Sequence, residues 1–137
     1  MTAQCTRATF SVDGRFPGLN EYTCACRAHA QAGGNIKRRE TAKVARAAKG
    51  MPAVRWPVVV KIKFYEKDRR RDVDNIEFGG KFILDGLVKA GVIPDDSQKY
   101  VWQVVPWVGI DKDHPRVVVT VESAKGGRDV PWRGQEV

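Results

Sequence analysis

Residues 57–65, Pro-Val-Val-Val-Lys-Ile-Lys-Phe-Tyr, begin as a continuous apolar run and end in alternation of polar and apolar residues. A continuous apolar run indicates a strand covered on both faces, and alternation indicates a strand with one face in the core. We therefore expect an interior strand of a sheet. Every residue from Lys67 to Asp72 is charged. A rigid strand that leads into a charged loop is a common way to present functional residues.

Patterns on both sides of this strand indicate further strands and helices. In chain order the expected elements are a strand at 7–12, helices at 19–31 and 36–49, the strand at 57–65, a third helix ending near Gly91, and strands at 100–110 and 116–122 joined by a hairpin at 111–115. The order strand-helix-helix-strand-helix-strand-strand predicts an α+β fold with a small mixed sheet and helices mainly on one face. We expect one domain over residues 1–124 and a loosely ordered tail at 125–137.

The composition is that of a chain with enough apolar residues for one compact core. The chain has 137 residues, 42% of them hydrophobic, which excludes wholesale disorder. No apolar run reaches the roughly 20 residues of a membrane-spanning helix, and the first residues lack the apolar core of a secretory signal. Three cysteines are an odd number and too few for a disulfide scaffold. We therefore expect a soluble, cytoplasmic protein with no membrane partner.

Positive charge is concentrated in the first half of the sequence. Residues 1–66 carry 12 Lys and Arg against 4 Asp and Glu, whereas residues 67–137 carry 12 of each. The net charge of +8 indicates a polyanionic partner, most commonly nucleic acid. The helix at 36–49 is the densest basic segment and predicts a cationic face that binds nucleic acid. The residues expected on that face are Lys37, Arg38, Arg39, Lys43 and Arg46.

Acidic residues gather in the second half, beginning where the charged loop ends. Asp72 and Asp74 are two residues apart, so in an extended segment their carboxylates point to the same side and can converge on one cation. Asp95-Asp96 follows the third helix, which we expect to return the chain toward the end of the strand 57–65. Oxygen ligands alone suit Mg²⁺ or Mn²⁺. The arginines expected to hold a phosphodiester against such a metal are Arg69, Arg70 and Arg71.

Five segments of the sequence can be compared with known families: residues 16–22, 71–75, 81–87, 89–93 and 95–98. They span most of the chain, and in content and order they resemble the RusA family of Holliday junction resolvases. These endodeoxyribonucleases are often encoded by phages and prophages.

The resemblance implies a Mg²⁺-dependent homodimer that cuts two strands symmetrically across four-way junction DNA in recombination and repair. It also implies that the protein is located in the cytoplasm of a bacterial or phage-infected bacterial cell. The family's catalytic, metal-binding aspartates match Asp72, Asp74 and Asp96, and its essential lysine matches Lys81. Arg71 matches the arginine before the first aspartate. The gap that precedes Lys81 is longer than in the best-known family pattern.

Other interpretations of the same residues stay open. Composition alone also fits a solvated mixed-charge loop at 69–74. One alternative is a non-catalytic basic module that binds nucleic acid and has no metal requirement. Another is a nuclease that acts on other branched DNA. Cys24 and Cys26 lack the Cys-x-x-Cys spacing of a zinc site, and we expect incidental thiols. We expect the Trp102 and Trp107 side chains to pack in the core or in a dimer contact rather than to stack on bases.

Overall fold

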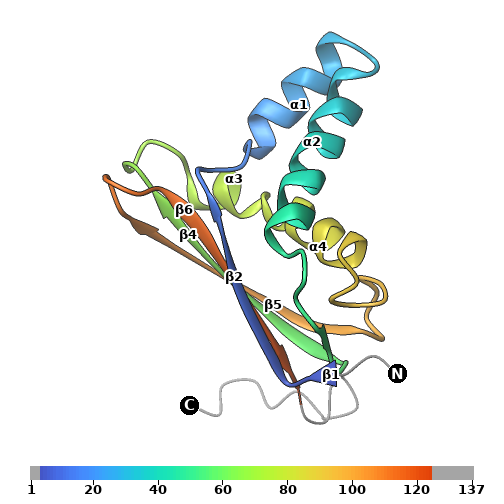
Figure 1. Cartoon of the computed structure of the whole chain (residues 1–137). Helices are drawn as coiled ribbons and strands as arrows, with labels where there is room; N and C mark the ends of the chain where they lie inside the picture. The colour runs from blue at the N-terminus through green and yellow to red at the C-terminus, as the bar shows by residue number, and fades with distance from the viewer. Residues whose placement is uncertain (1–3, 125–137) are drawn as a thin grey trace, which may run out of the picture.

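The computed structural model describes residues 4–124 and confirms a single small α+β domain (Figure 1). The tail expected at 125–137 lies outside the described residues. The elements are β1 (Gln4–Cys5), β2 (Arg7–Asp13), α1 (Leu19–Ala28), α2 (Ala32–Ala47), β3 (Ala53–Val54), β4 (Val58–Glu66), α3 (Val73–Glu77), α4 (Gly80–Lys89), β5 (Val101–Ile110) and β6 (Arg116–Ser123). This order agrees with the expected one, with the short parallel pair β1 and β3 added and the third helix divided.

β4 is an interior strand, as its sequence predicts. The four-stranded sheet has the order β2-β6-β4-β5, in which β4 pairs antiparallel with β6 and parallel with β5. Parallel neighbours need a crossover connection, and α3 and α4 supply it. β4 therefore carries side chains into the centre of the core, among them Ile62 and Phe64, each 1% exposed.

The predicted hairpin at 111–115 is wrong. β5 and β6 follow one another in the sequence but lie on opposite sides of β4. Their connection passes the end of β4, where the Asp111 amide donates to the Glu66 carbonyl oxygen at 2.8 Å. Two strands joined by a short connection are usually neighbours, and nothing local to these residues shows that β4 lies between them.

Helices cover one face of the sheet (Figure 1). Alternate residues of β2 and β6 point to that face and are buried, including Phe10, Val12, Val117 and Val119. Burial of each such side chain contributes about 1.5–3 kcal/mol. β5 differs, because most of its residues keep substantial exposure on both faces.

The first two helices have different bounds from those predicted. The break falls at residues 29–31, and Gly33 lies inside α2, where an added Cβ would overlap the Cys26 sulfur. Glycine there allows α1 and α2 to approach closely. α2 also packs on α4 at Gly86, where a Cβ would overlap the Val44 side chain. In Figure 1 the upper part of the α1–α2 pair projects beyond the sheet.

The third predicted helix is two helices, α3 and α4, with Phe78 and Gly79 between them. At this point Gly79 lies close to the loop before α1 and to β4. A Cβ on Gly79 would lie 3.1 Å from Phe16 Cβ and 3.2 Å from Phe64 Cε1. Within residues 4–124, none of the helices has the length and apolar character needed to cross a membrane.

Candidate active site

Asp72 and Asp74 lie where the charged loop meets α3. Asp72 is the N-cap residue, with an extended backbone, and Asp74 lies in the first helical turn. The predicted extended segment therefore ends at Asp72. Both residues are exposed, and Asp74 Oδ1 accepts a hydrogen bond from the Asn75 amide at 2.9 Å. Both aspartates are thus accessible to a ligand at the start of one short helix.

A hollow of about 300 Å³ opens beside this segment. It is lined by the loop, the start of α3 and the end of β5. Arg69 contributes to its wall, and Arg70 is next to it in the chain. The Arg70 side chain is 87% exposed, with Nε 3.6 Å from the Asp68 carboxylate. A surface ion pair of this kind is weak, so the guanidinium can leave it for a phosphate.

Arg71 is turned inward, unlike the two arginines before it. Nε and Nη2 donate to the two carboxylate oxygens of Glu66 at 2.9 Å each, and Nη1 donates to the Phe16 carbonyl oxygen at 2.9 Å. Only 11% of the Arg71 side chain and 5% of the Glu66 side chain are exposed. Glu66 occupies a position of β4 that faces the covered side, where a carboxylate needs a cationic partner. These contacts leave little of Arg71 for the DNA contact predicted from the sequence.

The adjacent residue Asn75 reaches another part of the chain. Its Oδ1 accepts a hydrogen bond from the Asn20 amide, in the first turn of α1, at 2.9 Å. Residues 16–22 and 71–75, which are distant in the sequence, therefore meet at the candidate site. Glu66 and this contact of Asn75 were not predicted, because only the tertiary structure reveals their partners.

Asp96 lies at the other end of the sheet. β4 and β5 run parallel with Val58 beside Val101, and the Val58 amide donates to the Tyr100 carbonyl oxygen at 2.9 Å. The residues just before β5 are therefore at the start of β4, whereas Asp72 follows its end. The two ends of a strand of this length are about 26 Å apart, at about 3.3 Å per residue.

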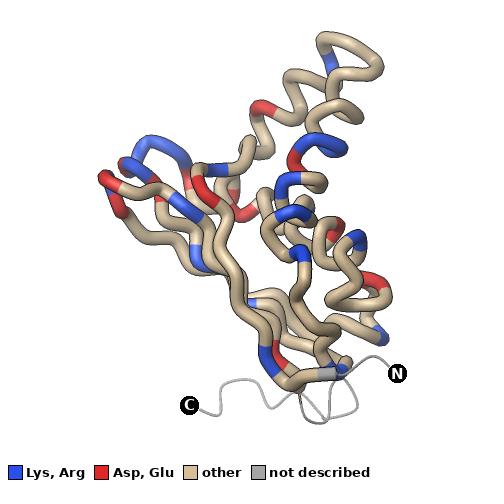
Figure 2. Tube along the Cα trace, viewed as in Figure 1, with Lys and Arg blue, Asp and Glu red and all other residues tan. Residues whose placement is uncertain are grey.

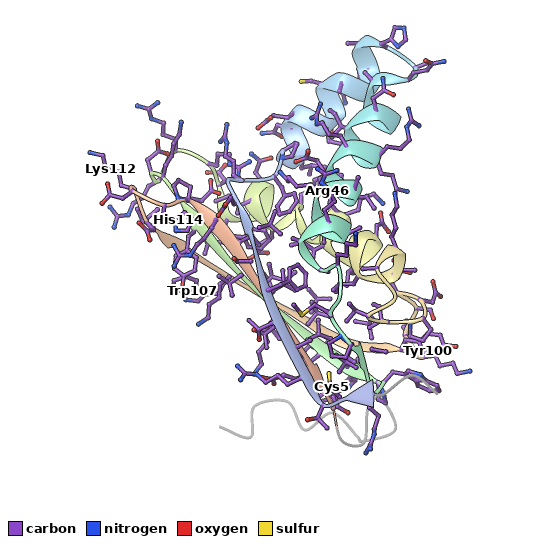
Figure 3. The ribbon with its side chains drawn as sticks, viewed as in Figure 1. Cys5, Arg46, Tyr100, Trp107, Lys112 and His114 are labelled. Carbon is purple, nitrogen blue, oxygen red and sulfur yellow. The ribbon has the colours of Figure 1, made fainter. Side chains whose placement is uncertain are left out.

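The expectation that the third helix returns the chain to the end of β4 is therefore wrong. A strand parallel to β4 must begin where β4 begins, so the crossover has to carry the chain past the whole length of the sheet. Figure 3 shows the two ends, with Tyr100 near one and Lys112 and His114 near the other. One chain does not bring Asp96 together with Asp72 and Asp74.

The acidic pair suits a partial Mg²⁺ site. Across residues 4–124, no three acidic, histidine or cysteine side chains lie close enough to hold a metal ion. Mg²⁺ commonly binds one or two protein carboxylates and completes its shell with water and substrate phosphates. Asp72 and Asp74 are the two exposed carboxylates of this segment that could take that role. Cys24 and Cys26 are free and exposed.

Lys43, predicted to face DNA, mostly contacts the protein itself. Its Nζ lies 2.7 Å from the carboxylate of buried Glu40, donates to the Arg15 carbonyl oxygen at 3.3 Å and stands 4.5 Å from the centre of the Phe16 ring. Lys43 therefore fastens α2 to the loop before α1. The sequence pattern did not reveal this, because Glu40 also looks like a surface residue.

The other predicted basic residues of α2 remain exposed, although some pair with nearby carboxylates. These residues are Lys37, Arg38, Arg39 and Arg46. Figure 2 shows Lys and Arg along α2 and in the loop that leaves β4. A groove of about 450 Å³ between α2 and α4 is lined by Arg46, Lys49 and Lys89. Lys89 is an additional candidate for phosphate binding that only the packing of α4 against α2 reveals.

Lys81 is exposed in the first turn of α4, directly after the Phe78-Gly79 break. That break follows α3, so Lys81 is separated from Asp74 by little more than one short helix. The loop 111–115 lies at the same end of the sheet. It is held by Arg116, whose hydrogen bond to Asp111 Oδ2 at 2.7 Å is the main cause that lowers the pKa of Asp111.

Comparison with known proteins gives one family. A family model described as Endodeoxyribonuclease RusA matches residues 20–122. That range holds β4, the charged loop, α3 and the residues before β5. No curated protein matches the chain.

Proposed function

Because the chain belongs to the RusA endodeoxyribonuclease family, we propose that it is a Mg²⁺-dependent nuclease that resolves four-way DNA junctions by paired, symmetric incisions. The observation that carries this proposal is the exposed pair Asp72 and Asp74 at a fixed position inside the matched range. The exposed arginines of the loop and the basic surface of α2 support a DNA substrate, because they supply phosphate contacts that need no particular base sequence.

Each residue of the site then has a role. Asp72 and Asp74 would hold Mg²⁺, or Mn²⁺, which supplies activation of water and stabilisation of charge on the scissile phosphate. Arg69 and Arg70 hold the DNA backbone beside the carboxylates. Lys81 would neutralise charge on the phosphate as it is attacked.

We also propose a homodimer, because paired incisions need two sites related by a two-fold axis. The open edge β5 is the best candidate for the contact. Val104 and Ile110 on its inner side are 37% and 42% exposed, and Trp107 on its outer side is 50% exposed. The other edge, β2, alternates its buried residues with exposed polar ones.

Such a dimer would also supply the missing carboxylate. When two copies meet along β5 across a two-fold axis, the strands run antiparallel. The start of one β5 then approaches the end of the other, which borders the hollow beside Asp72 and Asp74. Asp96 of the partner subunit, a few residues before its β5, would complete the acidic site.

The test is incision of a labelled synthetic four-way junction and of a linear duplex of the same sequence, with Mg²⁺ or with EDTA. We expect paired, Mg²⁺-dependent cuts in the junction that Asp74→Asn abolishes while DNA binding survives. Asp113→Asn removes an exposed carboxylate of the loop 111–115 that has no role in the proposed site, and it serves as the matched control. Equal cutting of the duplex would indicate a less selective nuclease, and binding without any incision would leave a nucleic-acid-binding module.

A further inference from the structure

Two contacts bracket Asp72 and Asp74. On one side Arg71 donates from Nη1 to the Phe16 carbonyl oxygen, and on the other Asn75 Oδ1 accepts from the Asn20 amide, both at 2.9 Å. Both contacts cross 55 residues of sequence. The segment that carries the two aspartates is thus held at each end by the turn at residues 16–20.

The first contact is fixed by the sheet. Glu66 ends β4, and its carbonyl oxygen accepts the Asp111 amide at 2.8 Å, so its backbone cannot shift independently. Its carboxylate takes two parallel hydrogen bonds from Arg71, a geometry that a planar guanidinium makes and a lysine ammonium does not. Arg71, the residue before Asp72, is therefore held in a fixed position relative to the end of β4.

The second contact replaces a helix cap. α1 starts after Gly18, which has no side chain to satisfy the free amides of the first turn. Asn75 supplies the acceptor from α3 instead. It approaches Gly18 so closely that a Cβ there would lie 2.5 Å from Asn75 Oδ1. The turn and α3 fit together only with glycine at this position.

We propose that Arg71 and Asn75 are positioning residues, which hold the backbone of Asp72 and Asp74 against the turn at 16–20 while the two carboxylates stay exposed to their ligands. The inference rests on the proposed nuclease function. Catalytic groups must be held to within a fraction of an ångström, and a shift of 1 Å can reduce the rate by about 100-fold. Arg71 thus acts on catalysis through Asp72 and Asp74, without touching DNA.

Arg71→Lys tests the first contact. It keeps the charge but loses the paired hydrogen bonds, so we expect a fall of about tenfold to 100-fold in the cleavage rate at saturating junction, with little change in the junction Kd. The Mg²⁺ concentration for half-maximal cleavage should rise. Arg70→Ala is expected to raise the junction Kd with little change in the cleavage rate at saturating junction. Arg7→Lys makes the same substitution in an exposed ion pair on β2 and is the matched control.

Asn75→Ala tests the second contact and keeps the inference testable if Arg71→Lys does not fold. Hydrogen exchange at the first turn of α1 should become faster in this variant and return toward the wild-type rate in Asn75→Asp, which retains an acceptor oxygen. This measurement needs neither metal nor DNA, so it separates the inference from the proposed function.

Two results would overturn the inference. One is Arg71→Lys weakening junction binding as Arg70→Ala does, with an unchanged rate at saturation, which would place Arg71 on a phosphate. The other is unchanged exchange at α1 in Asn75→Ala. Absence of cleavage by the wild-type chain, with the exchange effect present, would instead refute the nuclease function and leave the contact standing.

Discussion

Mixing two inactive variants tests whether each active site is shared between subunits. Asp74→Asn removes a carboxylate at the end of β4, and Asp96→Asn removes one near its start. Both residues are exposed, so each substitution should change the free energy of unfolding by less than about 0.5 kcal/mol. The ends of β4 are about 26 Å apart, whereas Mg²⁺ ligands lie about 2.1 Å from the ion, so one chain cannot supply both carboxylates.

The recovered activity follows from counting sites. In a dimer of one copy of each variant, the unchanged Asp74 of one copy meets the unchanged Asp96 of the other, and the second site lacks both. Random assembly of equal amounts makes about half of the dimers mixed, each with one intact site, so the mixture should recover about a quarter of the wild-type sites.

A supercoiled plasmid that extrudes a cruciform measures this directly. Wild-type dimers should linearise it by paired incision, whereas mixed dimers, obtained by co-expression, should only nick it. Asp95→Asn changes the residue next to Asp96 and should be active alone. A co-expressed mixture as inactive as each variant, or full activity of Asp96→Asn alone, would refute the shared site.

Three further outcomes follow from the packing and the charges. Gly18→Ala should lower the free energy of unfolding, measured in urea, by about 1–3 kcal/mol, because its Cβ would lie 2.5 Å from Asn75 Oδ1. A variant as stable as the wild type would show that the turn at 16–20 can shift to accept the Cβ. Lys89→Gln should reduce the slope of log K for junction binding against log salt by about 1, and an unchanged slope would remove Lys89 from the DNA surface. Arg116→Gln should raise the pKa of Asp111 toward 3.8, as followed by NMR, because the guanidinium is the main cause of the lowered value. Since that pKa is lowered on folding, the carboxylate's contribution to stability is present above pH 3.8 and is lost as the pH falls through the lowered pKa. The variant should lose the part of this dependence that Arg116 causes.

Much of the fold follows from local patterns. The apolar run at 57–65 identified β4, and the alternation at 7–12 identified β2 and its buried face. The helix bounds were less accurate, since the second helix was predicted to begin at residue 36, whereas it begins at Ala32 and its Gly33 serves a close contact with α1. A glycine inside a helix and a glycine that ends one look alike until the neighbouring helix is known.

The candidate site was also predicted only in part from the sequence. Its acidic pair and exposed arginines could be identified from residue type and spacing alone. The inward turn of Arg71 could not, because it depends on Glu66 being buried and on the Phe16 carbonyl oxygen being near. Lys43 likewise contacts Glu40 and the loop before α1. A charge on a helix or loop is predicted to be solvated unless its partner is known.

The sequence by itself determined the fold class, the interior strand β4, the family resemblance and the acidic and basic segments. The resemblance depends on short motifs, and the other features depend on composition and short periodicities, which are properties of neighbouring residues. Only the tertiary structure decided that β4 separates β5 from β6, and hence that Asp96 lies at the opposite end of the sheet from Asp72 and Asp74. The physical reason is that a strand's alternation specifies which face is buried, whereas the order of strands is set by packing between residues far apart in the chain.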